Sequence, residues 1–127
     1  MIELILCQWL RDSAAVTAAV PNIFAITLPK NLLYPSVRIS TLNNDIEQTF
    51  GGVTGDELAN IQIDYWAAST NEIAKIKKAL VTFLNSLTDN EPSVYCISNL
   101  REQPSYEEKT HIFKQTLELT LSYKELS

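Results

Sequence analysis

Two patterns of different period meet near the middle of the chain and constrain its fold more than any other feature. Residues 60–67, NIQIDYWA, alternate apolar and polar side chains, as a strand does when only one of its faces lies in a core. Residues 70–87 then place apolar side chains three and four positions apart on one side of a helix: Ile73, Ile76, Leu80, Phe83, Leu84 and Leu87. We therefore expect a strand that runs directly into an amphipathic helix.

The start of this helix is marked by a capping box. Ser69 and Glu72 have the spacing at which the hydroxyl accepts the third helical N–H and the carboxylate reaches back to the cap. After the helix, the segment TDNEP at 88–92 is typical of a turn. The central helix is therefore predicted with both of its ends.

A second helix pattern covers residues 2–19 and ends before Pro21, because the residue before a proline avoids the helical conformation. Its apolar side is formed by Ile2, Ile5, Leu6, Trp9 and Val16. Leu4 and Cys7 lie off that side. A second apolar side on a short helix indicates that a surface beyond the domain's own core touches it.

Four further segments have the composition of strands: residues 23–28, a run from Pro35, a run from Val94 and residues 112–123. Gln115 interrupts the apolar face of the last one, and a polar connection precedes it. The order is α-β-β-β-α-β-β. We expect a single α+β domain over residues 1–127, with a mixed or antiparallel sheet of about four to five strands carrying both helices on one face.

Residues 43–58, NNDIEQTFGGVTGDEL, differ from the rest in composition. They contain all three glycines of the chain, two asparagines and four acidic residues. This composition favours a long flexible loop, and loops of this length in compact domains are usually functional or disordered. Phe50, beside two glycines, gives the loop an apolar tip.

The overall charge disfavours two classes of partner. The formal net charge is −5 and the sequence pI is about 4.8. Binding to nucleic acid or to an anionic membrane usually depends on excess Lys and Arg, so neither is expected. No apolar run approaches the roughly 20 residues of a membrane helix. The N-terminus lacks the basic region of a signal peptide, so we expect a protein made and used in the cytoplasm.

No pattern in the sequence indicates catalysis or a metal. His111 is the only histidine, and Cys7 and Cys96 lie far apart, which favours two buried free thiols. The glycine-rich run at 51–56 is not followed by the Lys-Ser/Thr of a phosphate-binding loop. Three charged clusters are better explained as solvated: Asp45 with Glu47, Glu107 with Glu108, and Lys75, Lys77 and Lys78. We expect no enzyme activity and no cofactor.

The order of these motifs resembles the tail completion, or tail terminator, proteins of long-tailed bacteriophages and prophages. The resemblance spans nearly the whole chain. Its most specific segment is I-x-I-D-x-W-A at residues 61–67, followed at once by the capped helix. The second is a closing pattern of Tyr106 and Glu107, then Phe113, Lys114, Leu117, Glu118 and Leu119.

This resemblance implies a structural virion protein that assembles in the host cytoplasm. It implies a hexameric ring at the head-proximal end of the tail tube, which ends tube growth and joins the tail to the head. The implied partners are other copies of the chain, the tail tube protein and the head–tail connector. DNA passes through such a ring without specific binding, which an acidic lumen favours.

The interface expected from this reading involves the 43–58 loop and one tryptophan. The loop residues are predicted to touch a neighbouring subunit, the lumen or the tube: Asp45, Glu47, Phe50, Asp56 and Glu57. Trp66, with Gln62 and Asp64 on the polar face of its strand, is a candidate interface anchor. The alternative for Trp66 is burial under the N-terminal helix, and the alternative for the loop is disorder in the free monomer.

Two other functions fit the same sequence. One is a different neck or head-completion protein of the virion, which shares the size, the acidity and the lack of chemistry. The other is a small cytoplasmic ligand-binding α+β domain, which requires a concave pocket with convergent polar groups.

Overall fold

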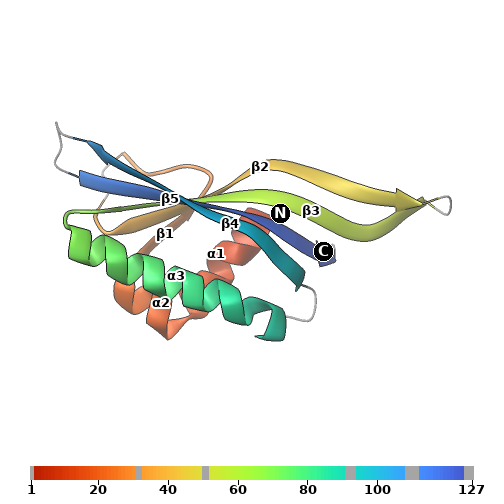
Figure 1. Cartoon of the computed structure of the whole chain (residues 1–127), viewed down its shortest axis with the longest axis horizontal. Coiled ribbons are helices and arrows are strands. Elements are labelled where there is room, and N and C mark those ends of the chain that lie inside the picture. The colour runs from red at the N-terminus through yellow and green to blue at the C-terminus, as the bar shows by residue number, and fades with distance from the viewer. Residues whose placement is uncertain (1, 31–32, 50–51, 91–93, 108–111, 125–127) are drawn as a thin grey trace.

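The computed structural model describes residues 2–30, 33–49, 52–90, 94–107 and 112–124 (Figure 1). Three helices are present in this part of the chain: α1 (Ile2–Asp12), α2 (Ala14–Ala19) and α3 (Thr70–Asn90). Five strands accompany them: β1 (Asn22–Ala25), β2 (Ser36–Thr49), β3 (Gly52–Ala67), β4 (Val94–Glu107) and β5 (Ile112–Lys124). Among the described residues, no helix is both long and apolar enough to cross a membrane.

The strands form one mixed sheet in the order β1-β2-β3-β5-β4. β1 runs parallel to β2, whereas the other neighbouring pairs are antiparallel. Figure 1 shows all three helices on one side of this sheet. The predicted α+β class, with a mixed sheet and the helices on one face, is confirmed. We call the side without helices the open face.

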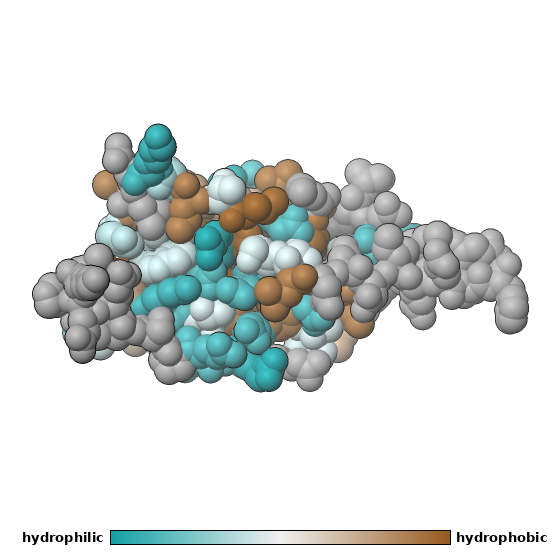
Figure 2. Space-filling view, turned by 90° about the horizontal axis from the view of Figure 1, so that it is seen from above, coloured by the Kyte–Doolittle hydropathy of each residue, from teal (hydrophilic) through white to brown (hydrophobic). Residues whose placement is uncertain are grey.

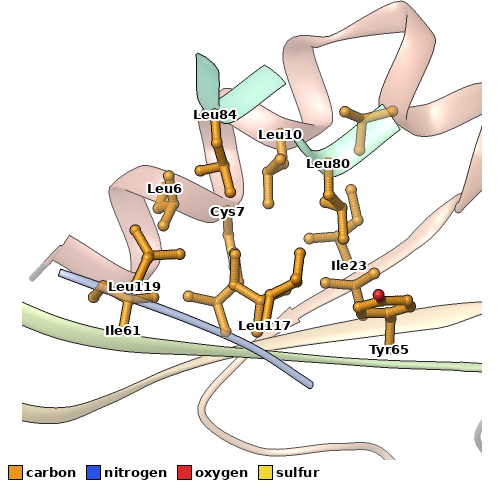
Figure 3. Packing of buried hydrophobic residues seen from close by; sticks show 14 of the residues in the cluster. Leu6, Cys7, Leu10, Ile23, Ile61, Tyr65, Leu80, Leu84, Leu117 and Leu119 are labelled. Carbon is orange, nitrogen blue, oxygen red and sulfur yellow. The ribbon is translucent and has the colours of Figure 1, made fainter. Parts of the chain in front are cut away.

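The core lies between the sheet and the helices. Ile61, Ile63 and Tyr65 of β3 are fully buried there, as the alternation predicted. They meet apolar side chains of α1, α3 and β5, which Figure 3 shows converging on one layer: Leu6, Leu10, Leu80, Leu84, Leu117 and Leu119. The hydroxyl part of the α3 cap is confirmed, because the Glu72 N–H donates to the Ser69 hydroxyl at 3.2 Å. The predicted end is wrong, since α3 continues through residues 88–90 of the expected turn.

Gln115 interrupts the apolar face of β5 because it serves a buried hydroxyl. The Tyr65 hydroxyl donates to the Gln115 side-chain oxygen at 2.6 Å, and the Gln115 amide donates to Glu102 at 2.9 Å. Glu102 in turn pairs with Lys77 of α3. A chain of polar contacts therefore leads from the core to the surface, so that the Tyr65 hydroxyl is not buried without a partner.

The predicted single helix over 2–19 is wrong, because the chain breaks at Ser13. Ser13 has an extended conformation (φ −85°, ψ 115°), and its hydroxyl accepts the N–H of Val16 as the N-cap of α2. Within α1 the core side is formed by Ile2, Leu6, Cys7 and Leu10, so the placement of Cys7 off the core side is also wrong. Ile5 and Trp9 are only partly buried.

The prediction of two buried free thiols is confirmed for Cys7 and wrong in its burial for Cys96. Both thiols are free, but Cys96 is exposed, whereas Cys7 is buried. Burial raises the pKa of the Cys7 thiol to about 11, opposed by the nearby Arg11 and reinforced by Glu3. Cys7 therefore stays a neutral thiol at physiological pH.

The predicted loop over 43–58 is wrong as secondary structure. Residues 43–49 of β2 pair with residues 52–58 of β3, with bulges between Thr41 and Asn43 and between Ile46 and Gln48. The backbone hydrogen bonds between β2 and β3 continue outward from the parts of both strands that pack in the core. They do not require alternating apolar side chains. The two bulges also disrupt the two-residue alternation of side chains on β2. Figure 1 shows this hairpin, which we call the arm, projecting past the helices.

The polar connection predicted before the last strand is also largely a strand. β4 continues to Glu107, which pairs with Ile112 of β5, across a bulge between Ser98 and Arg101. The same reasoning applies as for the arm, since β4 pairs with β5 through backbone groups although residues 100–107 show no apolar alternation. The two hairpins extend from opposite ends of the sheet (Figure 1).

Candidate functional site

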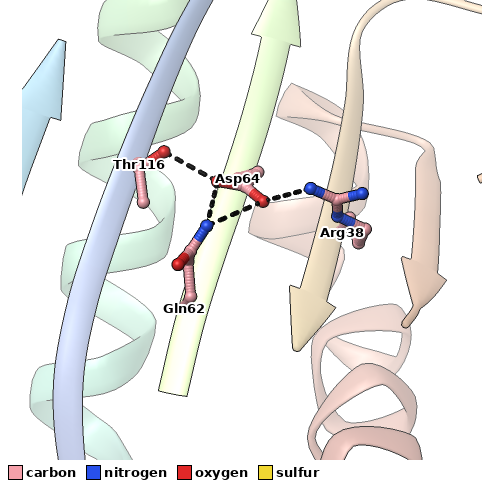
Figure 4. A network of polar contacts seen from close by, with 4 residues as sticks. All are labelled: Arg38, Gln62, Asp64 and Thr116. Carbon is pink, nitrogen blue, oxygen red and sulfur yellow. Dashed lines mark hydrogen bonds and ion pairs between the residues drawn. The ribbon is translucent and has the colours of Figure 1, made fainter. Parts of the chain in front are cut away.

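A row of three polar side chains crosses the middle of the open face. Arg38 of β2, Asp64 of β3 and Thr116 of β5 are direct register partners. The Asp64 carboxylate accepts hydrogen bonds from Arg38 Nη2 at 2.7 Å and from the Thr116 hydroxyl at 2.7 Å. Gln62, two residues earlier on β3, adds its amide at 3.0 Å (Figure 4). The row links three strands by side chains as well as by their backbones.

Asp64 is fully buried although no helix covers this face. Burial alone would raise the pKa of its carboxyl group. The hydrogen bonds from Arg38, Thr116 and Gln62, with the charge of Lys114, outweigh that effect and lower the pKa below its ordinary value. Asp64 is therefore an ionised structural centre of the open face, and its neighbours shield it from water.

Trp66 lies two residues beyond Asp64 on the same face of β3, and its register partners are Ser36 and Lys114. The Arg38 guanidinium carbon is 5.4 Å and the Lys114 Nζ 5.6 Å from the centre of a Trp66 ring, within the range of cation–π contacts. Its neighbours Tyr65 and Ala67 point into the core. Burial of Trp66 under the N-terminal helix is therefore wrong: the indole is half-buried on the open face by its own cationic neighbours.

The other predicted interface residues lie at the opposite end of β3. In the arm, Asp45 pairs with Leu58, and Glu57 pairs with Ile46 on one side and Tyr123 of β5 on the other. Asp56 pairs with Lys124, and Glu47 lies in β2 at the second bulge. Phe50 falls outside the described residues. The structure thus separates the predicted residues into the arm and the Trp66 end of the sheet.

The open face combines charged and apolar groups. Figure 2 shows this face, with hydrophilic and hydrophobic side chains interspersed over the middle of the sheet. Arg101 of β4 pairs with Glu118 of β5 at 3.2 Å. Near the arm, Leu42 is 59% exposed and Leu58 is 42% exposed. Such a surface is suited to contact with another protein, since exposed apolar side chains are rimmed by charges.

Sequence reasoning did not predict the Asp64 network. A signal was present: Arg38, Asp64 and Thr116 all stand on the polar side of their predicted strands, and they carry complementary groups. Without the register, however, nothing in the sequence places them opposite one another. Within the described residues, no group of three or more His, Cys, Asp or Glu side chains is arranged to hold a metal ion. His111 is outside that part of the chain.

Comparison with known proteins finds a likeness of structure and none of sequence. No known protein family and no curated protein matches the sequence. Among solved structures, the fold is similar to a chain of the "Virion of native gene transfer agent (GTA) particle", with a TM-score of 0.56. The two share 17% sequence identity, and the match covers 92% of this chain and 90% of that one. At this identity the likeness shows a shared fold over nearly the full length of both chains.

Proposed function

We propose that this chain is a structural protein of a bacteriophage-type virion and not an enzyme. In finer detail, we propose a tail terminator: a ring at the head-proximal end of the tail tube that stops tube growth and joins the head. The observation that carries the proposal is the shared fold with a virion chain over 92% of the length. The order of sequence motifs, which resembles the tail completion family, supports the finer assignment.

The shape of the protein suits a ring. The arm at one end and the helix layer on the body are different surfaces, so a contact between them in successive copies is heterologous. Heterologous contacts that close produce a ring, and closure leaves two unlike rims for two partners. One rim would meet the tube protein and the other the head–tail connector.

The charge of the arm suits a DNA passage. Four carboxylates occur within it, at Asp45, Glu47, Asp56 and Glu57. Where the arm faces the lumen, its acidic groups would repel phosphates, so that DNA passes without binding. In this proposal the arm contacts a neighbouring subunit, the lumen or the tube, and Trp66 anchors a contact made by the open face.

The ring is tested by native mass spectrometry of the purified protein across a concentration series. We expect a closed oligomer in equilibrium with the monomer, with six subunits as the family resemblance implies. In Trp66→Ala the monomer fraction should rise, because a large aromatic side chain is removed from the interface. Full rings in Trp66→Ala would exclude Trp66 as an anchor. A monomer at every concentration, or an open series of oligomers with no preferred size, would contradict self-assembly into a ring.

A different neck or head-completion protein is the second candidate. The same fold match favours it, because the matched chain belongs to a virion and the likeness does not indicate a position in the tail. The two candidates differ in one activity, the arrest of tube growth, which the Discussion takes up.

A further inference from the structure

The helix side of the molecule carries a groove that is not filled by the side chains of the core. It lies between the α1–α2 segment and α3 and has a volume of about 780 Å³. We call it the α2–α3 groove. Its apolar lining combines small and large side chains: Trp9, Ala15, Ala19, Ala79, Phe83 and Leu87. Trp9 and Phe83 are only partly buried, so the groove leaves apolar surface accessible beside the core. A surface of this kind is suited to a chain segment with apolar side chains.

Two lysines give the groove its charge. Lys75 and Lys78 line it from α3, and neither forms an ion pair within the described part of the chain. Lys77, between them, is paired with Glu102 instead. Asp12 lines the other side, where its carboxylate accepts the Gln8 amide at 2.9 Å. The groove thus carries two cations and one anion in a protein whose net charge is −5, which favours an acidic occupant.

The chain itself contains a segment of matching chemistry. The arm has four acidic residues, and the exposed apolar side chains Leu42 and Leu58 lie at its base. Figure 1 shows the arm directed away from the helix layer, so the groove of the same copy is out of its reach. A neighbouring copy that presents its helix layer at that end would meet the arm with a complementary surface.

We propose that the α2–α3 groove receives the arm of a second copy of this chain, with Lys75 and Lys78 facing the arm carboxylates. This inference rests on the ring of the proposed function and specifies its subunit contact. The contact is heterologous, since it joins the arm of one copy to the body of the next. It also covers apolar surface on both partners.

Zero-length cross-linking tests this contact directly. A carbodiimide joins a lysine amine to a carboxylate only when the two are in contact. In an equal mixture of unlabelled and nitrogen-15-labelled protein, we expect mixed-isotope peptides that join Lys75 or Lys78 to Asp45, Glu47, Asp56 or Glu57. Cross-links from these lysines only within one copy, only to other acids, or only to added tube protein would overturn the inference.

A charge exchange tests the same contact energetically. Lys78→Glu should weaken self-association by about tenfold, because it places like charges opposite each other. Glu47→Lys in the same chain as Lys78→Glu should recover most of the loss. The matched control is Lys30→Glu, which makes the same change in net charge on the exposed connection between β1 and β2. Equal weakening by Lys78→Glu and Lys30→Glu, or no recovery in the double variant, would contradict the proposed contact.

Failure of the contact and failure of the ring give different results. Rings that form normally in Lys78→Glu would reject the groove as the receptor and leave the ring intact. Absence of both rings and intermolecular cross-links in the unaltered protein would reject the groove and self-assembly together.

Discussion

Replacing Asp64 by alanine is expected to lower the free energy of unfolding by about 3 kcal/mol. The carboxylate accepts three side-chain donors on three strands, and its removal leaves Arg38, Thr116 and Gln62 without their shared acceptor. The Arg38 Nε is already buried without a hydrogen-bond partner, so the guanidinium would be held mainly by its cation–π contact with Trp66. Urea denaturation followed by circular dichroism measures the loss.

Asp64→Asn separates charge from shape and carries a pH signature. The lowered pKa of Asp64 means that its ionised form stabilises the fold above the carboxyl's ordinary pKa. This contribution is lost as the pH falls through the lowered, folded-state pKa. The stability difference between the native protein and Asp64→Asn should therefore shrink in acid. A difference that stays constant with pH, or an Asp64→Ala variant as stable as the native protein, would show that the network is not stabilising.

Leu6→Ala is expected to cost about 3 kcal/mol, from the lost burial of the side chain and the cavity that remains. Leu6 is fully buried where α1 meets the sheet, close to Leu119 and Ile61 (Figure 3). Thermal unfolding should show a clearly lower melting temperature with the same secondary structure.

The matched control is Leu4→Ala on the same helix. Leu4 is 56% exposed, so its truncation should change the stability of the monomer by less than about 0.5 kcal/mol. Equal losses in the two variants would mean that α1 does not pack as described. Of the predicted second apolar side only Leu4 is exposed, since Cys7 lies in the core. Reduced self-association in Leu4→Ala alone would support an intermolecular contact at Leu4.

The predictions from sequence succeeded where the pattern of apolar side chains indicates which face of an element is buried. The alternation at Ile61, Ile63 and Tyr65 placed β3, and the stripe of α3 with its cap at Ser69 placed the helix, because one face of each lies in the core. In the N-terminal segment the stripe was misassigned, because Cys7 and Leu10 of α1 lie in the core and Ser13 caps a separate helix.

The predictions failed where backbone pairing, and not the pattern of side chains, determines the structure. The arm and the far half of β4 are strands whose residues show no apolar alternation, because antiparallel pairing needs only backbone groups. The Asp64 network could not be found without the register that places Arg38 and Thr116 beside it. The α2–α3 groove depends on how α1, α2 and α3 pack together, which no local pattern specifies.

Arrest of tube growth is the most direct test of the proposed function. The purified protein is added to growing tubes of the tail tube protein from the same phage or prophage, and tube lengths are measured by electron microscopy. We expect short tubes with a density at one end, which stay short when more tube protein is supplied. Tubes that continue to lengthen in the presence of excess protein, with both ends bare, would contradict a tail terminator.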